Sequence, residues 1–203
     1  MAIDSTSTNL ATAVTFDATY EALKEKFSIE PTGHIDFQLN DFGVFKDYSS
    51  VAVTASYRIT TDCDSCYIIF ADTTRKVAGP RGRITEQREY QTWAIAYLKR
   101  DLGRILIRRE TLADKIIELI HPIELDFKED KPFSDTFYVL VDNLQKAIAG
   151  IDRNFRNAVM DIREDDFIIE INSHTLLAGS HKPIPPQKAL HLAEFIERLI
   201  STY

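Results

Sequence analysis

The chain has 203 residues, of which 44% are hydrophobic and 27% are charged, a composition typical of globular proteins that excludes disordered and fibrous classes. Its longest apolar runs are strand-sized, far below the roughly 20 residues that a membrane-spanning helix needs, so no transmembrane segment is expected. The net charge of −7 favours solubility and weighs against a nucleic-acid partner.

The first 14 residues, MAIDSTSTNLATAV, are polar and contain Asp4 but no basic residue. A secretory signal needs a positively charged start and a continuous apolar stretch, so this segment predicts a disordered tail. The two cysteines, Cys63 and Cys66, form a single C-x-x-C motif and not the spaced framework of a disulfide-rich secreted domain. We therefore expect a cytoplasmic protein.

The segment after the tail predicts one helix and three strands. Apolar residues at helical spacing between Phe16 and Phe27 indicate an amphipathic helix, which Pro31 and Gly33 end. Apolar and polar residues then alternate in three segments, the pattern of half-buried strands. These expected strands form an antiparallel meander over 34–39, 51–57 and 66–71.

The middle of the chain predicts a loop followed by a helix. Glycine and proline in segment 77–83 favour a mobile basic loop. Thr85 then provides a helix N-cap for segment 85–100, which Gly103 ends. The apolar face of this expected helix consists of Tyr90, Trp93, Ala94 and Tyr97.

The C-terminal half predicts alternating strands and helices. Pro122 ends one helix, Gly150 interrupts a second helical region, and Pro185 and Pro186 suit the first turn of a closing helix. The expected strands are 104–108, 123–127, 137–141, 167–171 and 175–178. The expected helices are 112–120, one or two within 144–161, and a last one containing 190–200.

These elements predict an α+β fold with a mainly antiparallel sheet flanked by three or more helices. Their order in the C-terminal part is ββα followed by ββα. The chain is expected to form one domain over residues 15–203, or two lobes divided near residue 80, where the glycine-containing loop falls.

Arg109 and Glu110 end an IRRE sequence, and a pattern of acidic, aromatic and turn-forming residues follows it. The residues of this pattern are Asp126, Phe127, Pro132, Phe133, Ser134 and Phe137. The two segments resemble a family of uncharacterised bacterial proteins in which an LRPE element precedes a DI.F...P.FS..F.V segment, with Arg109 in the place of the family's proline. The resemblance implies a bacterial origin and no assigned activity.

The second of these segments also has a direct structural interpretation. Pro132 fixes a turn, and Phe133 and Phe137 are spaced to enter the core on either side of it. Ser134 can exchange a hydrogen bond with the backbone where the chain re-enters the sheet. The pattern therefore indicates a folding signature.

Basic residues gather in the middle of the chain. Between Arg75 and Arg109 there are ten basic and three acidic residues, a local balance of +7, so the rest of the chain carries −14. The aromatic residues among them share the apolar face of the expected helix, which favours a place in the core over stacking on nucleic-acid bases. The residues expected to contact an acidic protein or an anionic surface are Arg81, Arg83, Arg108 and Arg109.

Three groups of residues are candidates for an atypical enzyme site. Cys63 and Cys66 have no second C-x-x-C beside them and fall between strands, where neither a zinc site nor a redox pair is typical. His174 and His181 flank a Gly-Ser turn, but a metal site would need a third ligand. The third group is two acidic clusters where loops meet strands, Glu129–Asp130 and Glu164–Asp165–Asp166. We expect no cofactor and no metal.

The sequence contains no nucleophile elbow, phosphate-binding loop, dinucleotide-binding motif or zinc-protease motif. We therefore favour a non-catalytic binding or regulatory module that recognises an acidic partner through its basic segment. Two alternatives stay open. One is an enzyme that uses Cys63 and Cys66 or Asp165 and Asp166, and the other is a self-associating structural protein.

Overall fold

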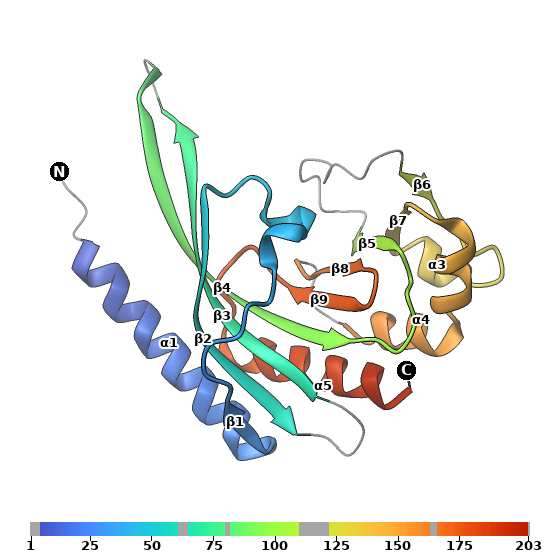
Figure 1. The fold of residues 1–203 in the computed structure, drawn as a ribbon, viewed down its shortest axis with the longest axis horizontal. Helices are drawn as coiled ribbons and strands as arrows, with labels where there is room; N and C mark the ends of the chain where they lie inside the picture. Colours follow the sequence, from blue (N-terminus) through green and yellow to red (C-terminus); the bar gives the residue numbers. More distant parts are fainter. Residues whose placement is uncertain (1–4, 61–64, 80–81, 110–121, 163–165, 203) are drawn as a thin grey trace.

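Nine antiparallel strands form one sheet in the computed structural model, which describes residues 5–60, 65–79, 82–109, 122–162 and 166–202 (Figure 1). Their order across the sheet is β1-β2-β3-β4-β9-β8-β5-β7-β6. The pairing of β4 with β9 joins the N-terminal strands to the C-terminal ones. The strands are β1 (Ile29–Pro31), β2 (Ser50–Thr60), β3 (Ser65–Ala78), β4 (Ile84–Tyr97), β5 (Arg104–Arg109), β6 (Ile123–Glu124), β7 (Phe137–Val141), β8 (Ile168–Asn172) and β9 (Thr175–Gly179).

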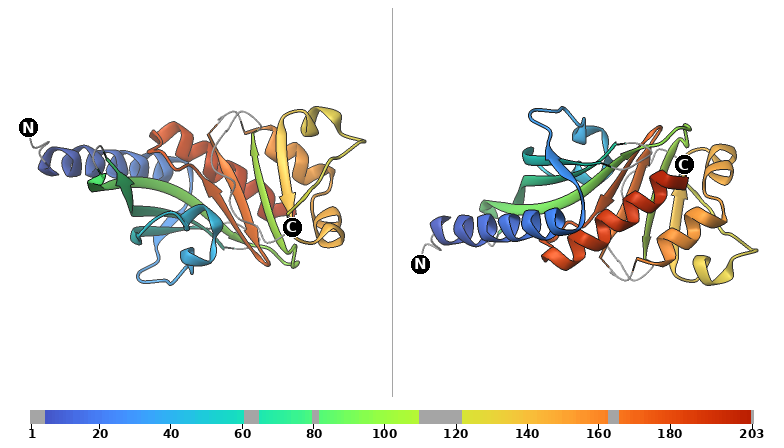
Figure 2. Two further views of the ribbon diagram at one scale, coloured as in Figure 1. Left: turned by 90° about the horizontal axis from the view of Figure 1, so that it is seen from above. Right: turned by 90° about the horizontal axis from the view of Figure 1, so that it is seen from below.

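Two long helices, α1 (Ser5–Lys26) and α5 (Pro186–Thr202), pack against each other along one face of the sheet (Figure 2). The opposite face is covered by the segment between β1 and β2, which contains two 3-10 turns. The shorter α-helices lie toward the β7 end of the sheet, away from the two 3-10 turns (Figure 1). The remaining helical elements are η1 (Leu39–Asp41), η2 (Gly43–Phe45), α2 (Lys131–Ser134), α3 (Leu144–Gly150) and α4 (Arg153–Met160).

Alternate residues of the central strands face two apolar clusters, one on each side of the sheet. The helix-side cluster includes Leu23, Ile68, Phe70, Ile105 and Ile196. The opposite cluster includes Phe37, Phe42, Phe45, Ile69 and Trp93. Because both faces are covered, the central strands are apolar on both sides and do not alternate between apolar and polar residues.

The expected fold class, an α+β protein whose sheet is flanked by three or more helices, is wrong. The sheet dominates the structure, and within the described ranges more residues lie in strands than in α-helices. The main error is segment 85–100, expected as a helix, which forms most of the 14-residue strand β4. Residues 91–96 are all buried, and a continuously buried run lacks the periodicity that would separate a strand from a helix.

Other differences lie in the N-terminal half. Segment 34–39, expected as a strand, is irregular because Gln38 has a left-handed backbone (φ 52°) just before η1. The buried side chains of Phe37 and Leu39 nevertheless follow the alternation in the sequence. Helix α1 begins at Ser5, inside the segment expected as a tail. Near residue 80 the chain passes from β3 to β4, two neighbours in the same sheet.

Several predicted elements are confirmed. The strands expected at 51–57, 104–108 and 137–141 are present as β2, β5 and β7, and the final hairpin is β8–β9. The helical region around Gly150 divides into α3 and α4, which begin where Asn143 and Asp152 accept hydrogen bonds from first-turn N–H groups. The closing helix is α5. The helix expected at 112–120 lies outside the described residues.

Candidate functional site

Strands β3 and β4 extend beyond the rest of the sheet as a two-stranded ribbon (Figure 1). Strand β2 pairs with β3 only as far as the pair Ser50–Thr74, and β9 pairs with β4 only over Trp93–Tyr97. Among the described residues, the four pairs from Arg75–Gln87 to Ala78–Ile84 therefore have no third strand beside them. We refer to residues 75–79 and 82–87 as the arm.

The free end of the arm closes through backbone contacts. The Gly79 N–H donates a hydrogen bond of 2.6 Å to the Arg83 carbonyl, which continues the strand pairing. Gly82 has φ +73°, a left-handed conformation that glycine adopts without the steric cost of a side chain. The glycine-containing segment that predicted a mobile loop is thus the connection between two long paired strands.

Ion pairs hold two cations near the base of the arm. Arg75 forms a salt bridge of 2.8 Å with Glu89. Arg88 donates from Nε to both carboxylate oxygens of the buried Asp72, at 2.7 and 2.8 Å. The hydrogen bond to Asp72 raises the pKa of Arg88 above its ordinary value. These two arginines are therefore held by acidic groups of the sheet.

The cations nearer the free end are placed differently. Lys76 and Arg83 are exposed, and neither forms a salt bridge with any described residue. Glu86 is the acidic residue of the arm and pairs in register with Lys76. The free end therefore presents cationic groups to the surroundings.

Two aliphatic side chains are exposed beside these cations. Ile84 is 67% exposed and Val77 is 37% exposed. Ile84 pairs with Ala78, while Val77 pairs with Thr85. Because consecutive pairs in a ladder point to opposite faces, Ile84 and Val77 lie on opposite faces of the arm. Each face of the arm therefore carries one exposed aliphatic side chain near the cations.

A buried polar network supports the arm from the side opposite the helices. The Gln91 Nε2 group donates to Tyr48 Oη at 2.8 Å and to the His181 carbonyl at 3.0 Å, while Gln91 Oε1 accepts from Trp93 Nε1 at 2.9 Å. Tyr48 Oη donates to Glu89 at 3.2 Å. Burial is the main cause that raises the pKa of Tyr48 to about 12. The neutral phenol thus links the buried network to the acid that holds Arg75.

Helix α1 supports the base of the arm on the other face. Phe16 stacks on Phe70, with ring centroids 4.3 Å apart, and contacts Tyr90 edge-on at 6.0 Å. The Arg88 guanidinium lies 5.3 Å from the centre of the Tyr90 ring. With both faces braced, the base of the arm is fixed to the body of the protein.

The structure separates the arginines that the sequence grouped as partner contacts. Arg83 lies at the free end of the arm, whereas Arg108 and Arg109 end β5, away from the arm (Figure 1). Arg108 and Arg109 are half-buried and stack over Tyr138 and Phe137, 5.1 and 5.2 Å from the ring centres. Arg109 also donates to the Ile162 carbonyl at 2.8 Å. Arg81 lies outside the described residues.

The environment of Cys66 suppresses the reactivity of its thiol. Cys66 is fully buried in the helix-side cluster, and burial raises the pKa of its thiol to about 12. Nucleophilic and metal-binding cysteines act as thiolates, which Cys66 does not form near neutral pH. Cys63 lies outside the described residues. In the part of the chain that the structure describes, no three His, Cys, Asp or Glu residues are grouped to hold a metal ion.

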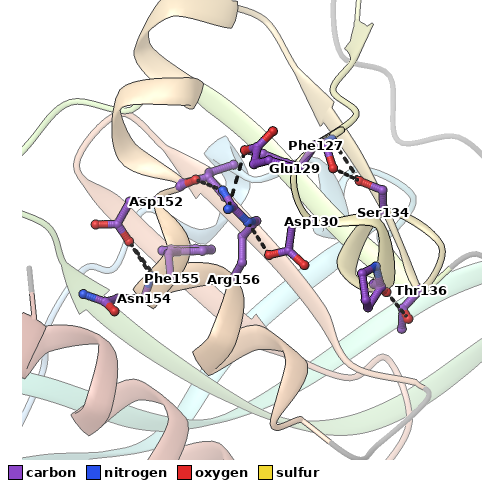
Figure 3. A network of polar contacts seen from close by, with 11 residues as sticks. Phe127, Glu129, Asp130, Ser134, Thr136, Asp152, Asn154, Phe155 and Arg156 are labelled. Atoms are coloured by element: carbon purple, nitrogen blue, oxygen red, sulfur yellow. Dashed lines mark hydrogen bonds and ion pairs between the residues drawn. The ribbon is translucent and has the colours of Figure 1, made fainter.

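One acidic cluster neutralises a buried arginine, as Figure 3 shows. Arg156 of α4 donates from Nε to Asp130 at 2.7 Å and from Nη1 to the Ile151 carbonyl at 3.0 Å. Its guanidinium also lies 3.5 Å from a Glu129 oxygen. Glu129 and Asp130 therefore fasten the turn before α2 to α4 and do not form an open carboxylate pair.

The described residues of the other candidate groups, Asp166, His174 and His181, also make contacts within the fold. Asp166 accepts hydrogen bonds from Ser180 Oγ and Lys188 Nζ, both at 3.2 Å. Glu164 and Asp165 lie outside the described residues. His174 and His181 are at opposite ends of β9 and do not form a pair. His181 packs against Tyr48 and Trp93 in the network below the arm.

A groove of about 410 Å³ lies between α4 and α5. Apolar side chains including Phe167 and Phe195 line it, together with four titratable residues. Two of these, Asp161 and Arg198, form an ion pair, and Glu194 pairs with Lys26 of α1. The charges around the groove are thus largely matched within the protein.

Sequence reasoning missed Gln91, Glu170 and Arg156, the polar residues that organise the interior. Each is buried, and each has at least one partner that lies far away in the sequence. A signal exists for Glu170, a lone acid inside the apolar strand sequence IIEIN. A buried carboxylate requires hydrogen-bond partners, so it predicts an anchoring point.

No protein-family model matches the chain, and no curated protein sequence matches it. The fold is similar to a solved structure described as the crystal structure of the mycobacterial trehalose monomycolate transport factor A, TtfA. The two share 12% sequence identity with a TM-score of 0.60, over 91% of this chain and 92% of the other. At this identity the similarity shows the fold alone. None of the helices in the described ranges is long and apolar enough to cross a membrane.

Proposed function

We propose that the protein is a non-catalytic binding module that captures an anionic partner through the arm. The observation that carries this proposal is the projecting ribbon, whose exposed Lys76 and Arg83 form no salt bridge among the described residues. Arg81, which the sequence places between them, adds a further cation. Exposed cations on a braced ribbon are suited to meeting an acidic surface.

The distribution of charge supports the same conclusion. The chain carries −7 overall, while residues 75–87 hold four basic residues and one acidic residue, a balance of +3, so the rest of the chain carries −10. An anionic partner is repelled by most of the molecule and attracted at the arm, so the charges favour one orientation of approach. Arg108 and Arg109 as partner contacts remain a prediction, and their stacking on Tyr138 and Phe137 suits packing better than capture. Cysteine usage and the resemblance in the sequence support a bacterial cytoplasm as the location of the proposed module.

The enzyme alternative has less support. Cys66 is buried as a neutral thiol, and Asp166 is engaged by Ser180 and Lys188. General acid–base or nucleophilic work needs a group that is accessible and able to change its protonation state near the working pH. Cys66 does not meet that requirement, and Asp166 is held by two neighbouring side chains.

Charge reversal on the arm tests the proposal. The variant Arg81→Glu/Arg83→Glu should lose an acidic partner that wild-type protein captures from native-host lysate under mild cross-linking. The control Lys128→Glu/Lys182→Glu makes the same change in net charge at exposed positions outside the arm, and it should keep that partner. If both variants capture the same components as the wild type, the arm is not the binding surface.

A second candidate function, self-association, is favoured by the edge of the sheet at β2. Strand β1 pairs with β2 only over Tyr57–Ile59, so in the described structure residues 50–55 have a strand on one side only. Such an edge can pair with another chain, although the irregular register between Val53 and Ala55 opposes a long ladder. Sedimentation over a dilution series should show a concentration-dependent dimer, and a monomer at every concentration would exclude it.

A further inference from the structure

We infer that the anionic partner of the arm is a lipid membrane surface, into which the free end of the arm inserts. This inference rests on the proposed function and assigns the class of partner. Ile84 and Val77 enter the boundary between headgroups and acyl chains, and Arg83 and Lys76 meet the lipid phosphates. The remainder of the protein stays in water.

The placement of the aliphatic side chains favours a lipid over a protein partner. Ile84 and Val77 lie on opposite faces of the ribbon, and Ile84 is 67% exposed. A protein surface covers one face of a ribbon unless it offers a deep cleft. A lipid interface surrounds whatever enters it, so it removes both side chains from water together.

The length of the arm suits this role. Four residue pairs extend beyond the third strand, and a strand rises about 3.3 Å per residue, so the arm projects by about 13 Å. Interfacial segments lie about 5–10 Å deep in the headgroup region. The arm is therefore long enough to place its end at that depth while the sheet remains outside.

The projection separates the cation at the end of the arm from an acidic body. Residues 75–87 carry +3, so the rest of the chain carries −10, which an anionic surface repels. Charges separated by more than the Debye length, about 8 Å at physiological ionic strength, are largely screened from one another. Arg83, whose carbonyl accepts from Gly79 at the far end of the arm, lies about 13 Å from the third strand and so beyond that distance from the acidic body. The membrane therefore attracts the end of the arm more than the body repels it.

Vesicle binding tests this inference, with phosphatidylcholine vesicles containing one-third phosphatidylglycerol as the anionic probe. Wild-type protein should sediment with these vesicles and not with pure phosphatidylcholine. Ile84→Ser should weaken binding by about tenfold, because the side chain no longer gains by leaving water. The control Ile148→Ser removes another exposed isoleucine, 54% exposed on α3, and should bind as the wild type does.

A fluorescence experiment reports insertion directly. The chain has one tryptophan, Trp93, which is fully buried, so its emission should not respond to vesicles. Ile84→Trp adds a second tryptophan at the end of the arm. Its emission should shift to shorter wavelength with anionic vesicles and be quenched by brominated lipid. An unchanged emission in the presence of bound vesicles would overturn insertion.

An acidic polypeptide used as a second probe distinguishes the proposed function, capture of an anionic partner, from the inference that this partner is a membrane. If poly-glutamate binds through Arg81 and Arg83 while anionic vesicles do not bind, the partner is an acidic protein and the lipid inference is wrong. If neither probe binds, the inference and the proposed function both fail. If vesicles bind equally to wild type and Ile84→Ser, contact is purely electrostatic and insertion is refuted.

Discussion

Replacing Glu170 should release the segment that covers one face of the sheet. Glu170 is a carboxylate of β8 with only 2% of its surface exposed. Its two oxygens accept hydrogen bonds from the backbone N–H groups of Gly43 and Val44, at 2.7 and 2.9 Å. These bonds fasten η2, whose Phe45 packs against Trp93, to the sheet. The carboxylate therefore acts as a clamp between segments 127 residues apart.

The size of the effect follows from the two bonds. Glu170→Ala leaves both N–H groups without an acceptor, and an unsatisfied buried donor costs about 1–3 kcal/mol. We expect a loss of about 2–6 kcal/mol, a large part of the roughly 5–15 kcal/mol that holds a typical domain together. Glu170→Gln keeps one acceptor oxygen, so its loss should be about 1–2 kcal/mol.

Urea unfolding followed by circular dichroism measures these losses, with the exposed Glu124→Gln as a neutral control. Amide hydrogen exchange at Gly43 and Val44 should accelerate in both Glu170 variants. If Glu170→Ala is as stable as the wild type, the two hydrogen bonds do not hold the segment and the reasoning is wrong.

The same residue gives a pH dependence of defined sign. Burial raises the pKa of Glu170 above its ordinary value, against the opposing effect of the Gly43 and Val44 hydrogen bonds. The folded protein then binds this proton more tightly than the unfolded chain does. The contribution to stability is present below the ordinary pKa of about 4.3 and is lost as pH rises through the raised value. The stability advantage of wild type over Glu170→Gln should be larger at about pH 4 than at about pH 8, and the opposite trend would show that the pKa is lowered.

Three further predictions concern the core and the network under the arm. In a Cys63→Ser variant, Cys66 should react with a thiol reagent far more slowly in the folded state than in urea, since burial raises its pKa to about 12; equal rates would place the thiol at the surface. Tyr48→Phe should remove a phenol with a pKa of about 12 from an ultraviolet titration and destabilise the protein by about 1 kcal/mol. Because the pKa is raised, the stability that Tyr48 provides should persist at neutral pH and be lost as pH approaches 12; a titration unchanged by the substitution would refute the assignment. Gly179→Ala should cost about 1–3 kcal/mol, since its Cβ would lie 2.6 Å from Trp93 Cε3, and an unchanged thermal midpoint would contradict this.

The turn before β7 could be predicted from residues that are close together in the sequence. Ser134 was expected to exchange hydrogen bonds with the backbone, and its Oγ accepts from Phe127 N at 2.9 Å. Phe133 and Phe137 were expected in the core, and both are buried, with ring centroids 5.3 Å apart. These contacts span at most seven residues. Short-range patterns of this kind determine a turn with little help from the rest of the fold.

The arm illustrates what the sequence could not determine. The glycines and Arg83 indicated an exposed basic connection at the right position. The spacing of the aromatic residues Tyr90, Trp93 and Tyr97 matched the period of a helix, yet these residues belong to strand β4. The choice depends on pairing with β3 and with β9, which lies about 80 residues later. Such long-range pairing overrides local propensity, and it also creates the projection, because β2 and β9 stop short of the end of the hairpin.

The buried polar contacts could not be predicted from the sequence, because they too depend on long-range pairing of strands. Gln91 bonds Tyr48 and the His181 carbonyl, partners that lie 43 and 90 residues away along the chain. No local spacing connects them, and glutamine alone is typical of a solvent-exposed position. They become identifiable as a network only when the strands have placed them together.

Removing the arm tests the central claim most directly. Arg75 and Gln87 are paired across the ribbon, so replacing residues 76–86 with Asn-Gly should close a two-residue hairpin of the favoured type. This variant keeps the supporting contacts of Glu89, Gln91 and Tyr90 and should unfold at the same urea concentration as the wild type. We predict that it no longer binds anionic vesicles or poly-glutamate at low salt, where the wild type binds at least one of them. A folded, shortened protein that binds both probes as the wild type does would show that the arm is not the binding surface.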